Sequence, residues 1–230
     1  MGSMTSVTAA AVAFVGTHFI LSHPLRKPLA GAIGERGFQG IYSLVAFLTF
    51  GWLVYAFRRA PVTALLWPVG DVLWAIASVV MLIASILLMG SLIRNPALPT
   101  GGRPAPFPEA ARGVFAVTRH PMMWALALWG LCHIAVYPVA KSVVLGSAIV
   151  ILALVGSALQ DRKKEQLQPE LWPVWESKTS YWPFAAILAG RARLGGFGMH
   201  SLAGGLVVWL VATWAHIPLT GWAAGIWRWL

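Results

Sequence analysis

The stretch VLWAIASVVMLIASILLMGSLI, residues 72–93, contains no charged side chain and is long enough to cross the hydrocarbon core of a bilayer as a helix. The rest of the chain has a similar character. Of its 230 residues, 58% are hydrophobic and only 10% are charged, and the mean hydropathy is +0.73. A soluble domain of this length is far less apolar and carries more charge. The composition therefore predicts an integral membrane protein.

Further apolar stretches approach residues 72–93 in length, and together they define the predicted fold. We place six membrane spans at residues 5–22, 38–57, 72–93, 120–138, 142–160 and 202–218, the last of them interrupted by Pro218 and Gly221. The predicted fold class is an all-α polytopic membrane protein with about six transmembrane helices. We treat residues 4–230 as a single domain and interpret the preceding Met-Gly-Ser as an expression scar.

Basic residues are distributed unevenly between the predicted spans. Thirteen of the 17 Lys and Arg residues fall in the connections 23–37, 94–119 and 161–201, and four fall elsewhere. The positive-inside rule places these three connections in the cytoplasm, and both termini on the far side of the membrane. The net charge of +10 is therefore explained by topology, and we expect a lipid bilayer as partner and no nucleic acid.

The connections themselves differ in composition. Residues 161–184, DRKKEQLQPELWPVWESKTSYWPF, mix charges with Leu and Trp, and we interpret them as an amphipathic segment along the cytoplasmic membrane surface. Residues 94–110 are rich in proline and are predicted to form an extended loop. The glycine-rich residues 190–200, GRARLGGFGMH, are predicted to be a flexible connection.

Ionisable side chains inside the spans are the first candidates for function, because such residues are costly in lipid and usually face protein or water. His18, His133 and His216 lie within spans. His23 and His120 each precede a proline close to an arginine, which places them at helix ends near the lipid headgroups. There they either cap or hydrogen-bond the helix end or take part in a site.

Neutral imidazoles from two different helices are the ligand pair of a bis-histidine haem iron, and His18 and His133 are the candidates. The alternative for each is a structural hydrogen bond between helices, which is the interpretation we keep for His216. Depth is a difficulty, since His18 lies about 12 Å along its helix from Arg26 and His133 about 21 Å from Arg119. Axial ligands must be nearly level. Either Arg119 lies well outside the hydrocarbon, or His18 pairs with another residue.

Other reactive side chains form no catalytic constellation in the sequence. All carboxylates are placed in connections, which argues against a proton-coupled transporter; they are Glu35, Asp71, Glu109, Asp161, Glu165, Glu170 and Glu176. The one cysteine, Cys132, permits no internal disulfide and excludes a metal site built from cysteines.

Three motifs carry a family resemblance. FVGTHFILSHPLRKPLAGAIGERGFQGIYSLVA (residues 14–46), RHPMMWALALWGLCHI (residues 119–134) and DRKKEQ with the later TSYWPFAAILAGR (residues 161–166 and 179–191) resemble the NnrU family of bacterial membrane proteins. That family takes its name from a link to nitrite and nitric oxide metabolism. The same pattern is similar to the plastid cis-zeta-carotene isomerases, which use haem b to convert one double bond of a polyene from cis to trans.

The resemblance implies a cofactor and roles for particular residues. Haem b would be held by His18 and His133, the positions that match the axial histidines. His120 would cap its helix or contact a haem propionate together with Arg119, and His23 and Arg26 are further propionate partners. The implied location is the inner membrane of a bacterium, with both termini periplasmic.

The implied function is that of a haem-dependent isomerase or redox enzyme acting on a hydrophobic or small gaseous ligand. One alternative is a non-catalytic haem sensor or carrier linked to nitrite and nitric oxide metabolism. A weaker resemblance, to isoprenylcysteine methyltransferase-like membrane enzymes with their Arg-His-Pro motif, adds methyl transfer from S-adenosylmethionine. Where those enzymes carry adjacent glutamates, this chain has Lys163-Lys164 and Glu170-Leu171, which argues against that cofactor.

Overall fold

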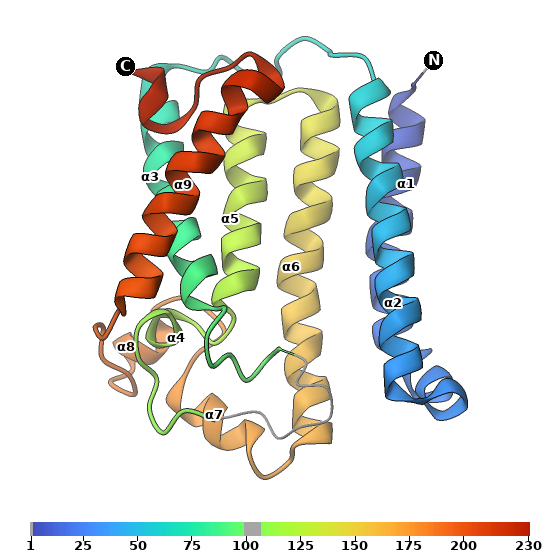
Figure 1. The fold of residues 1–230 in the computed structure, drawn as a ribbon, viewed down its shortest axis with the longest axis vertical. Helices are drawn as coiled ribbons and strands as arrows, with labels where there is room; N and C mark the ends of the chain where they lie inside the picture. The colour runs from blue at the N-terminus through green and yellow to red at the C-terminus, as the bar shows by residue number, and fades with distance from the viewer. Residues whose placement is uncertain (1, 99–106) are drawn as a thin grey trace.

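The computed structural model describes residues 2–98 and 107–230, and in these ranges the long elements are all helices. Six long helices form the bundle in Figure 1: α1 (Met4–Ser22), α2 (Arg26–Arg59), α3 (Asp71–Gly90), α5 (Pro121–Val136), α6 (Ala140–Leu167) and α9 (Met199–Thr220). Five of them are long and apolar enough to cross a membrane, and α5, with 16 residues, is a shorter apolar helix. The predicted all-α polytopic membrane fold is confirmed.

The predicted spans match the centres of these helices and differ at the ends. Helix α2 begins at Arg26, well before the predicted residue 38, with a kink at Gly34, whose φ of 75° lies in the left-handed region that favours glycine. Helix α6 continues to Leu167 instead of ending at 160. Helix α9 runs through Pro218, where the sequence predicted an interruption.

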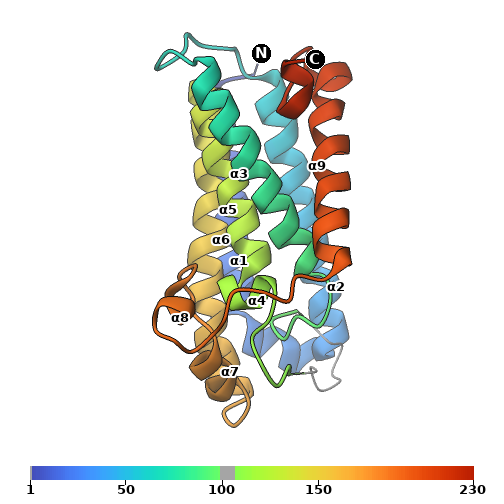
Figure 2. The ribbon, with the colours of Figure 1, turned by 90° about the vertical axis from the view of Figure 1, so that its left-hand side faces the viewer.

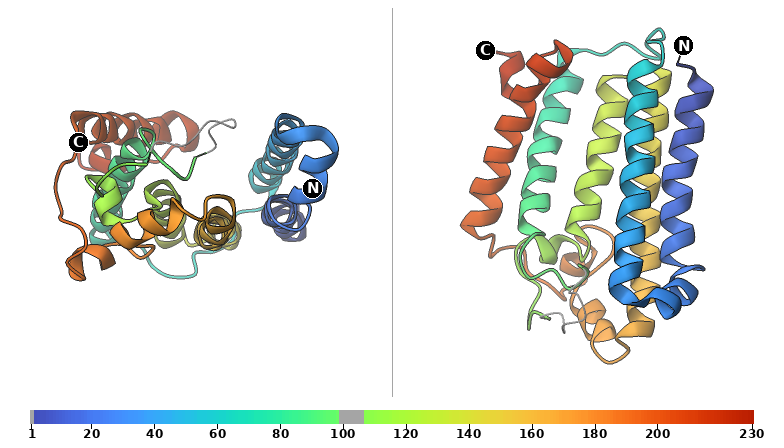
Figure 3. Two further views of the ribbon diagram at one scale, coloured as in Figure 1. Left: turned by 90° about the horizontal axis from the view of Figure 1, so that it is seen from below. Right: turned by 45° about the vertical axis from the view of Figure 1, so that its right-hand side comes forward.

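Neighbouring helices pack in a definite order. Helix α6 packs against α5 on one side and α1 on the other, α3 packs against α5 and α9, and α2 packs against α1. Seen from below in Figure 3, α1 and α2 form a pair at one edge of the bundle, and α6 lies between that pair and α5. A side chain on α1 and one on α5 are therefore separated by the width of a helix.

The two ends of the bundle differ in charge. Both chain termini lie at one end, which we call the terminal end (Figure 1). The three basic connections, after α1, after α3 and after α6, all lie at the other end, which we call the basic end. This agrees with an even number of crossings. The predicted extended loop falls partly on residues 99–106, which lie outside the described residues.

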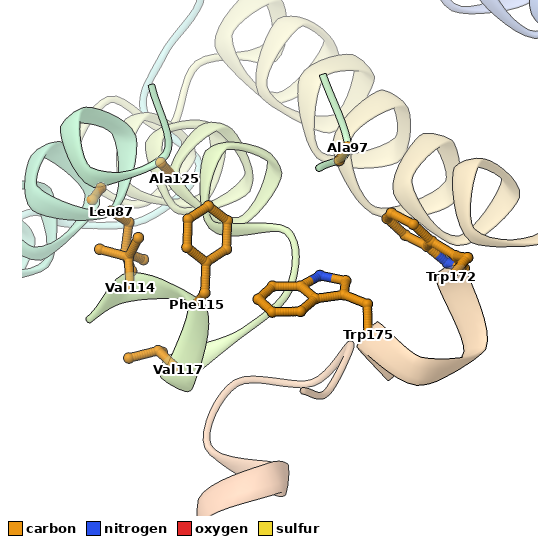
Figure 4. Close-up of a cluster of buried hydrophobic side chains, with 9 residues drawn as sticks. Leu87, Ala97, Val114, Phe115, Val117, Ala125, Trp172 and Trp175 are labelled. Carbon is orange, nitrogen blue, oxygen red and sulfur yellow. The ribbon is translucent and has the colours of Figure 1, made fainter. Parts of the chain in front are cut away.

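Short helices cover the basic end. Figure 2 shows α4 (Val114–Val117), α7 (Trp172–Lys178) and α8 (Ala185–Leu188) below the long helices, and a 3₁₀ turn (Gly225–Arg228) follows α9 at the terminal end. Trp172 and Trp175 of α7 are buried, and Trp175 packs on Phe115 with ring centroids 5.8 Å apart (Figure 4). The amphipathic segment thus directs these two tryptophans into the protein, while Leu171 and Trp182 are exposed.

Helices α5 and α6 approach most closely through glycines. A Cβ on Gly146 would lie 2.6 Å from Cγ1 of Ile134, and a Cβ on Gly130 would lie 2.8 Å from the carbonyl oxygen of Gly146. Small residues permit such close helix contacts in membranes. This contact fixes the terminal half of α5, the part that carries His133.

Candidate functional site

The residues predicted to bind a cofactor divide between the two ends of the bundle. His18, His23 and Arg26 lie toward the end of α1 and the start of α2, and Arg119 and His120 lie directly before α5, all at the basic end. His133 lies in the last turn of α5, at the terminal end. The structure therefore does not bring His18 and His133 together, since α6 separates their helices and they face opposite ends.

His133 is instead paired with a histidine of the last membrane helix. Its ring lies 6.0 Å from that of His216, centroid to centroid, and the two ring planes are 29° from parallel. Trp129, one turn earlier on α5, stacks on His133 with centroids 4.1 Å apart. No sequence pattern connects His133 with His216, because their proximity depends on how α5 and α9 are arranged around α3.

Both histidines of this pair are held in the same way. Nδ1 of His133 donates to the carbonyl oxygen of Trp129 at 2.8 Å, and Nδ1 of His216 donates to the carbonyl oxygen of Ala212 at 2.8 Å. A hydrogen bond at Nδ1 fixes the tautomer and leaves Nε2 with a lone pair. This is the state in which imidazole binds a metal.

His18 has the same hydrogen bond but different neighbours. Its Nδ1 donates to the carbonyl oxygen of Phe14 at 2.6 Å, and its ring contacts Phe14 and, across to α2, Tyr42 at 5.5 Å. An apolar cavity of about 250 Å³ lies beside it, lined by Phe14, Tyr42, Ser43, Ala46, Phe47 and Phe50. His18 therefore belongs to an aromatic group between α1 and α2.

The basic end holds a buried cluster of charged groups around His120. Nε2 of His120 contacts Oδ1 of Asp161 at 2.7 Å, and Nε of Arg119 donates to Oδ2 of the same carboxylate at 2.8 Å. Arg119 also pairs with Glu176 at 3.1 Å. The side chains of His120 and Asp161 are 1% and 9% exposed, so the carboxylate is shared by two donors away from water. His120 precedes α5, but its side chain does not cap that helix as the sequence predicted. It contacts Asp161 instead.

The expectation that every carboxylate lies in a connection is wrong for four of them, which belong to the helices α2, α3 and α6: Glu35, Asp71, Asp161 and Glu165. Of these four, only Asp161 is buried. It belongs to α6, a candidate membrane span, and is 6% exposed. The predicted span ended one residue before it. The signal in the sequence is the four-residue spacing of Ala153, Ser157 and Asp161, which places them on one face of the helix. The structure buries all three.

Glu176 on α7 is the second carboxylate of this cluster and pairs with Arg119. Burial raises the pKa of Glu176, and the nearby carboxylates of Asp161 and Glu165 raise it further, while Arg119 lowers it. Burial is the largest of these causes. The glutamate is therefore held less firmly in its charged form than an exposed one would be.

His23 and Arg26, the other predicted propionate partners, are engaged locally. Nδ1 of His23 lies 2.8 Å from Oγ of Ser22 and 3.3 Å from the carbonyl oxygen of Phe19, at the C-terminus of α1. Arg26 donates to both carboxylate oxygens of Glu35 at 3.0 Å. The contacts of His23 thus match the first alternative, a hydrogen bond at the end of its helix.

Several buried polar atoms at the basic end have no hydrogen-bond partner among the residues that the structure describes. They are Nε2 of His23, Oε1 of Gln168 and the indole nitrogens of Trp172 and Trp175. An ordered water is the smallest group that satisfies such atoms. Among residues 2–98 and 107–230, no group of three or more His, Cys, Asp and Glu side chains is placed to hold a metal ion.

Comparison with known proteins identifies relatives for most of the chain. A family model described as NnrU protein matches residues 6–224. A curated protein, the chloroplastic 15-cis-zeta-carotene isomerase of Zea mays, is 32% identical over 84 residues, which are 36% of this chain and 22% of that protein. The match therefore spans a minor part of the isomerase. No solved structure matches the chain.

Proposed function

Because the chain belongs to the NnrU family, whose model matches residues 6–224, we propose that it is a haem b membrane protein acting as an isomerase or redox enzyme. Its ligand would be hydrophobic or a small gas. The similarity to a carotene isomerase favours a polyene among hydrophobic substrates, since that relative is named for a carotene. Such a substrate would reach the protein through the lipid.

The pair His133 and His216 is the observation that carries the proposal. Two imidazoles that bind one metal must lie close together in space. The observed centroid separation is 6.0 Å. Both Nδ1 atoms are occupied by backbone carbonyls, which leaves both Nε2 atoms as donors toward a metal. His133 and His216 are therefore the residues that would hold the iron of a haem.

The proposal keeps His133 from the pair predicted from sequence and exchanges His18 for His216. The separation of α1 from α5 by α6 supports this exchange. It also removes the difficulty of depth, because α5 and α9 both carry their histidine near the terminal end. The predicted propionate partners Arg119, His120, His23 and Arg26 lie at the opposite end, so they have no role toward this pair.

Haem, if bound here, would supply an iron able to interact with a double bond or a diatomic gas. The residues of the chain do the rest. His133 and His216 would hold and orient the group from two helices, and Trp129 packs against the ring of His133. The neighbouring side chains of α5 and α9 are mostly apolar, which suits a hydrophobic cofactor.

Absorption spectra of single histidine variants test the proposal. We expect the wild-type protein, purified in detergent, to show a Soret band and sharp low-spin bands after reduction. His133→Ala and His216→Ala should each lose the low-spin bands or the haem. His18→Ala should keep both, as should His200→Ala, a control at the basic end of α9 whose Nε2 contacts only the carbonyl oxygen of Met89.

Two results would contradict this assignment. Loss of the low-spin bands in His18→Ala but not in His216→Ala would restore the pair predicted from sequence. A wild-type protein that takes up no haem and binds S-adenosylmethionine would favour the methyltransferase alternative.

A further inference from the structure

A cavity of about 580 Å³ opens at the basic end, outside the membrane spans. Its walls are residues 109–112 before α4, Lys178 at the end of α7, and residues 190–196, which connect α8 to α9. Cavities of this size hold small molecules or headgroups. None of the residues in the histidine pair or in the His120 cluster lines it.

The charge of the cavity is strongly positive. Four cationic side chains line it, those of Arg112, Lys178, Arg191 and Arg193, against the carboxylate of Glu109. Lys178 and Arg191 hydrogen-bond backbone carbonyls of the cavity walls. Nζ of Lys178 donates to the carbonyl oxygen of Glu109, and Arg191 donates to three carbonyl oxygens at the end of α7.

Arg112 and Arg193 differ from these two wall residues. Within the described ranges none of the four cations forms an ion pair, but Lys178 and Arg191 donate to carbonyls, whereas the exposed Arg112 and Arg193 donate to none. Their guanidinium groups are therefore the ones free to bind an anion from solution or from the bilayer.

The backbone of this cavity adds further donors. The amide of Gly113 donates to the carbonyl oxygen of Gly195 at 2.8 Å, which holds the two walls together. Gly196 has a φ of 72°, and a Cβ on Gly113 would lie 3.2 Å from its carbonyl oxygen, so both positions require glycine. Within the described structure, the amides of residues 193–196 donate to no backbone carbonyl outside the helices. These amides are therefore available as donors, and successive backbone amides of a loop can form an anion-binding concavity.

The surroundings of the cavity indicate where its ligand comes from. Leu194, which lines the cavity, is 60% exposed, and Leu188 on α8 is 86% exposed. Apolar side chains exposed beside arginines are typical of a surface that meets the bilayer at headgroup level. Basic pockets at this level of a membrane protein bind anionic lipid headgroups.

We propose that the cavity formed by residues 109–112, Lys178 and residues 190–196 binds a phosphate group, and that its source is the headgroup of an anionic phospholipid. Arg112 and Arg193 pair with the phosphate oxygens, and the amides of residues 193–196 complete the contacts. The glycine-rich connection, predicted from sequence to be merely flexible, is then one wall of a binding site. This inference is independent of the haem proposal.

Native mass spectrometry of the full chain in detergent, titrated with phosphatidylglycerol, tests the proposal. We expect Arg112→Gln and Arg193→Gln each to weaken binding about five-fold, the effect of one basic residue at an anionic lipid surface, and the double variant about twenty-five-fold. Arg193→Lys should retain most of the affinity. Arg58→Gln, at the terminal end, is the matched control and should change nothing.

A parallel titration with inorganic phosphate and glycerol phosphate identifies the source. If these bind with the same dependence on Arg112 and Arg193 and phosphatidylglycerol does not compete, the cavity binds phosphate but takes it from a soluble ester, and the lipid assignment is wrong. Equal affinity of the double variant and Arg58→Gln for all three probes would overturn the site itself. Circular dichroism and elution volume establish that each variant is folded.

Discussion

Replacing Asp161 by asparagine should destabilise the protein far more than a surface charge change of the same kind. In the wild type the carboxylate accepts from His120 at 2.7 Å and from Arg119 at 2.8 Å, and its side chain is only 9% exposed. Asp161→Asn keeps the size but removes the charge, which leaves Arg119 buried with Glu176 as its remaining carboxylate partner.

The magnitude follows from burial. Removing one partner of a buried ion pair costs about 3–5 kcal/mol, because the other charge is left without compensation. Glu176 still offsets part of that cost, so we expect about 3 kcal/mol. For a chain of this length, 1 kcal/mol corresponds to roughly 2–4 °C in Tm, which predicts a fall of roughly 6–12 °C.

Glu35→Gln is the matched control. It removes the same charge from the Arg26–Glu35 pair, which has a similar distance of 3.0 Å but a glutamate side chain that is 55% exposed. Exposed pairs contribute about 0–1 kcal/mol. Thermal unfolding in one detergent, followed by tryptophan fluorescence, measures both variants. Equal, small shifts for the two variants would refute the argument that burial of the Asp161 cluster stabilises the basic end.

Three further predictions concern packing, protonation and topology. Gly146→Ala should lower the free energy of unfolding by about 1–3 kcal/mol, because the added methyl would push α6 away from α5. Gly51→Ala is the control, because its surroundings are open, and it should be neutral or stabilise the protein by up to about 1 kcal/mol. Thermal unfolding compares the two variants. Burial raises the pKa of Glu176 above its usual 4.5, so the native state binds more protons than the unfolded state and loses stability as the pH rises above 4.5. The stability of Glu176→Gln minus that of the wild type should therefore increase as the pH rises above 4.5, and a flat difference would contradict this. Finally, a cysteine at Ser177 should react with an impermeant thiol reagent only from the cytoplasmic side and one at Thr63 only from the periplasmic side, and the reverse pattern would invert the predicted orientation.

The membrane helices were predictable from sequence because the bilayer imposes a length and an apolar composition on each span. Their ends were less predictable, because a helix can continue into the headgroup region once protein covers its polar residues. Asp161 shows this. A span predicted from hydropathy ends at the first charged residue. Helix α6 continues past Asp161, because Arg119 and His120 bind its carboxylate inside the fold.

The sequence identifies the candidate histidines one by one but does not show which two lie together. An imidazole in an apolar span signals a function from sequence alone, and His18, His133 and His216 were all recognised as intramembrane. Which two share a site depends on the order of helices around the bundle. In this order His216 of α9 lies beside His133, and α6 lies between α1 and α5. The periodicity of residues along one helix does not predict the order of the helices.

The haem content of the wild-type protein tests the central claim most directly. A pyridine haemochrome assay on protein purified from cells supplied with haem precursor should give the spectrum of haem b, at one haem per chain. Protein that is folded and monodisperse, yet remains colourless and gains no Soret band when haemin is added, would contradict the account.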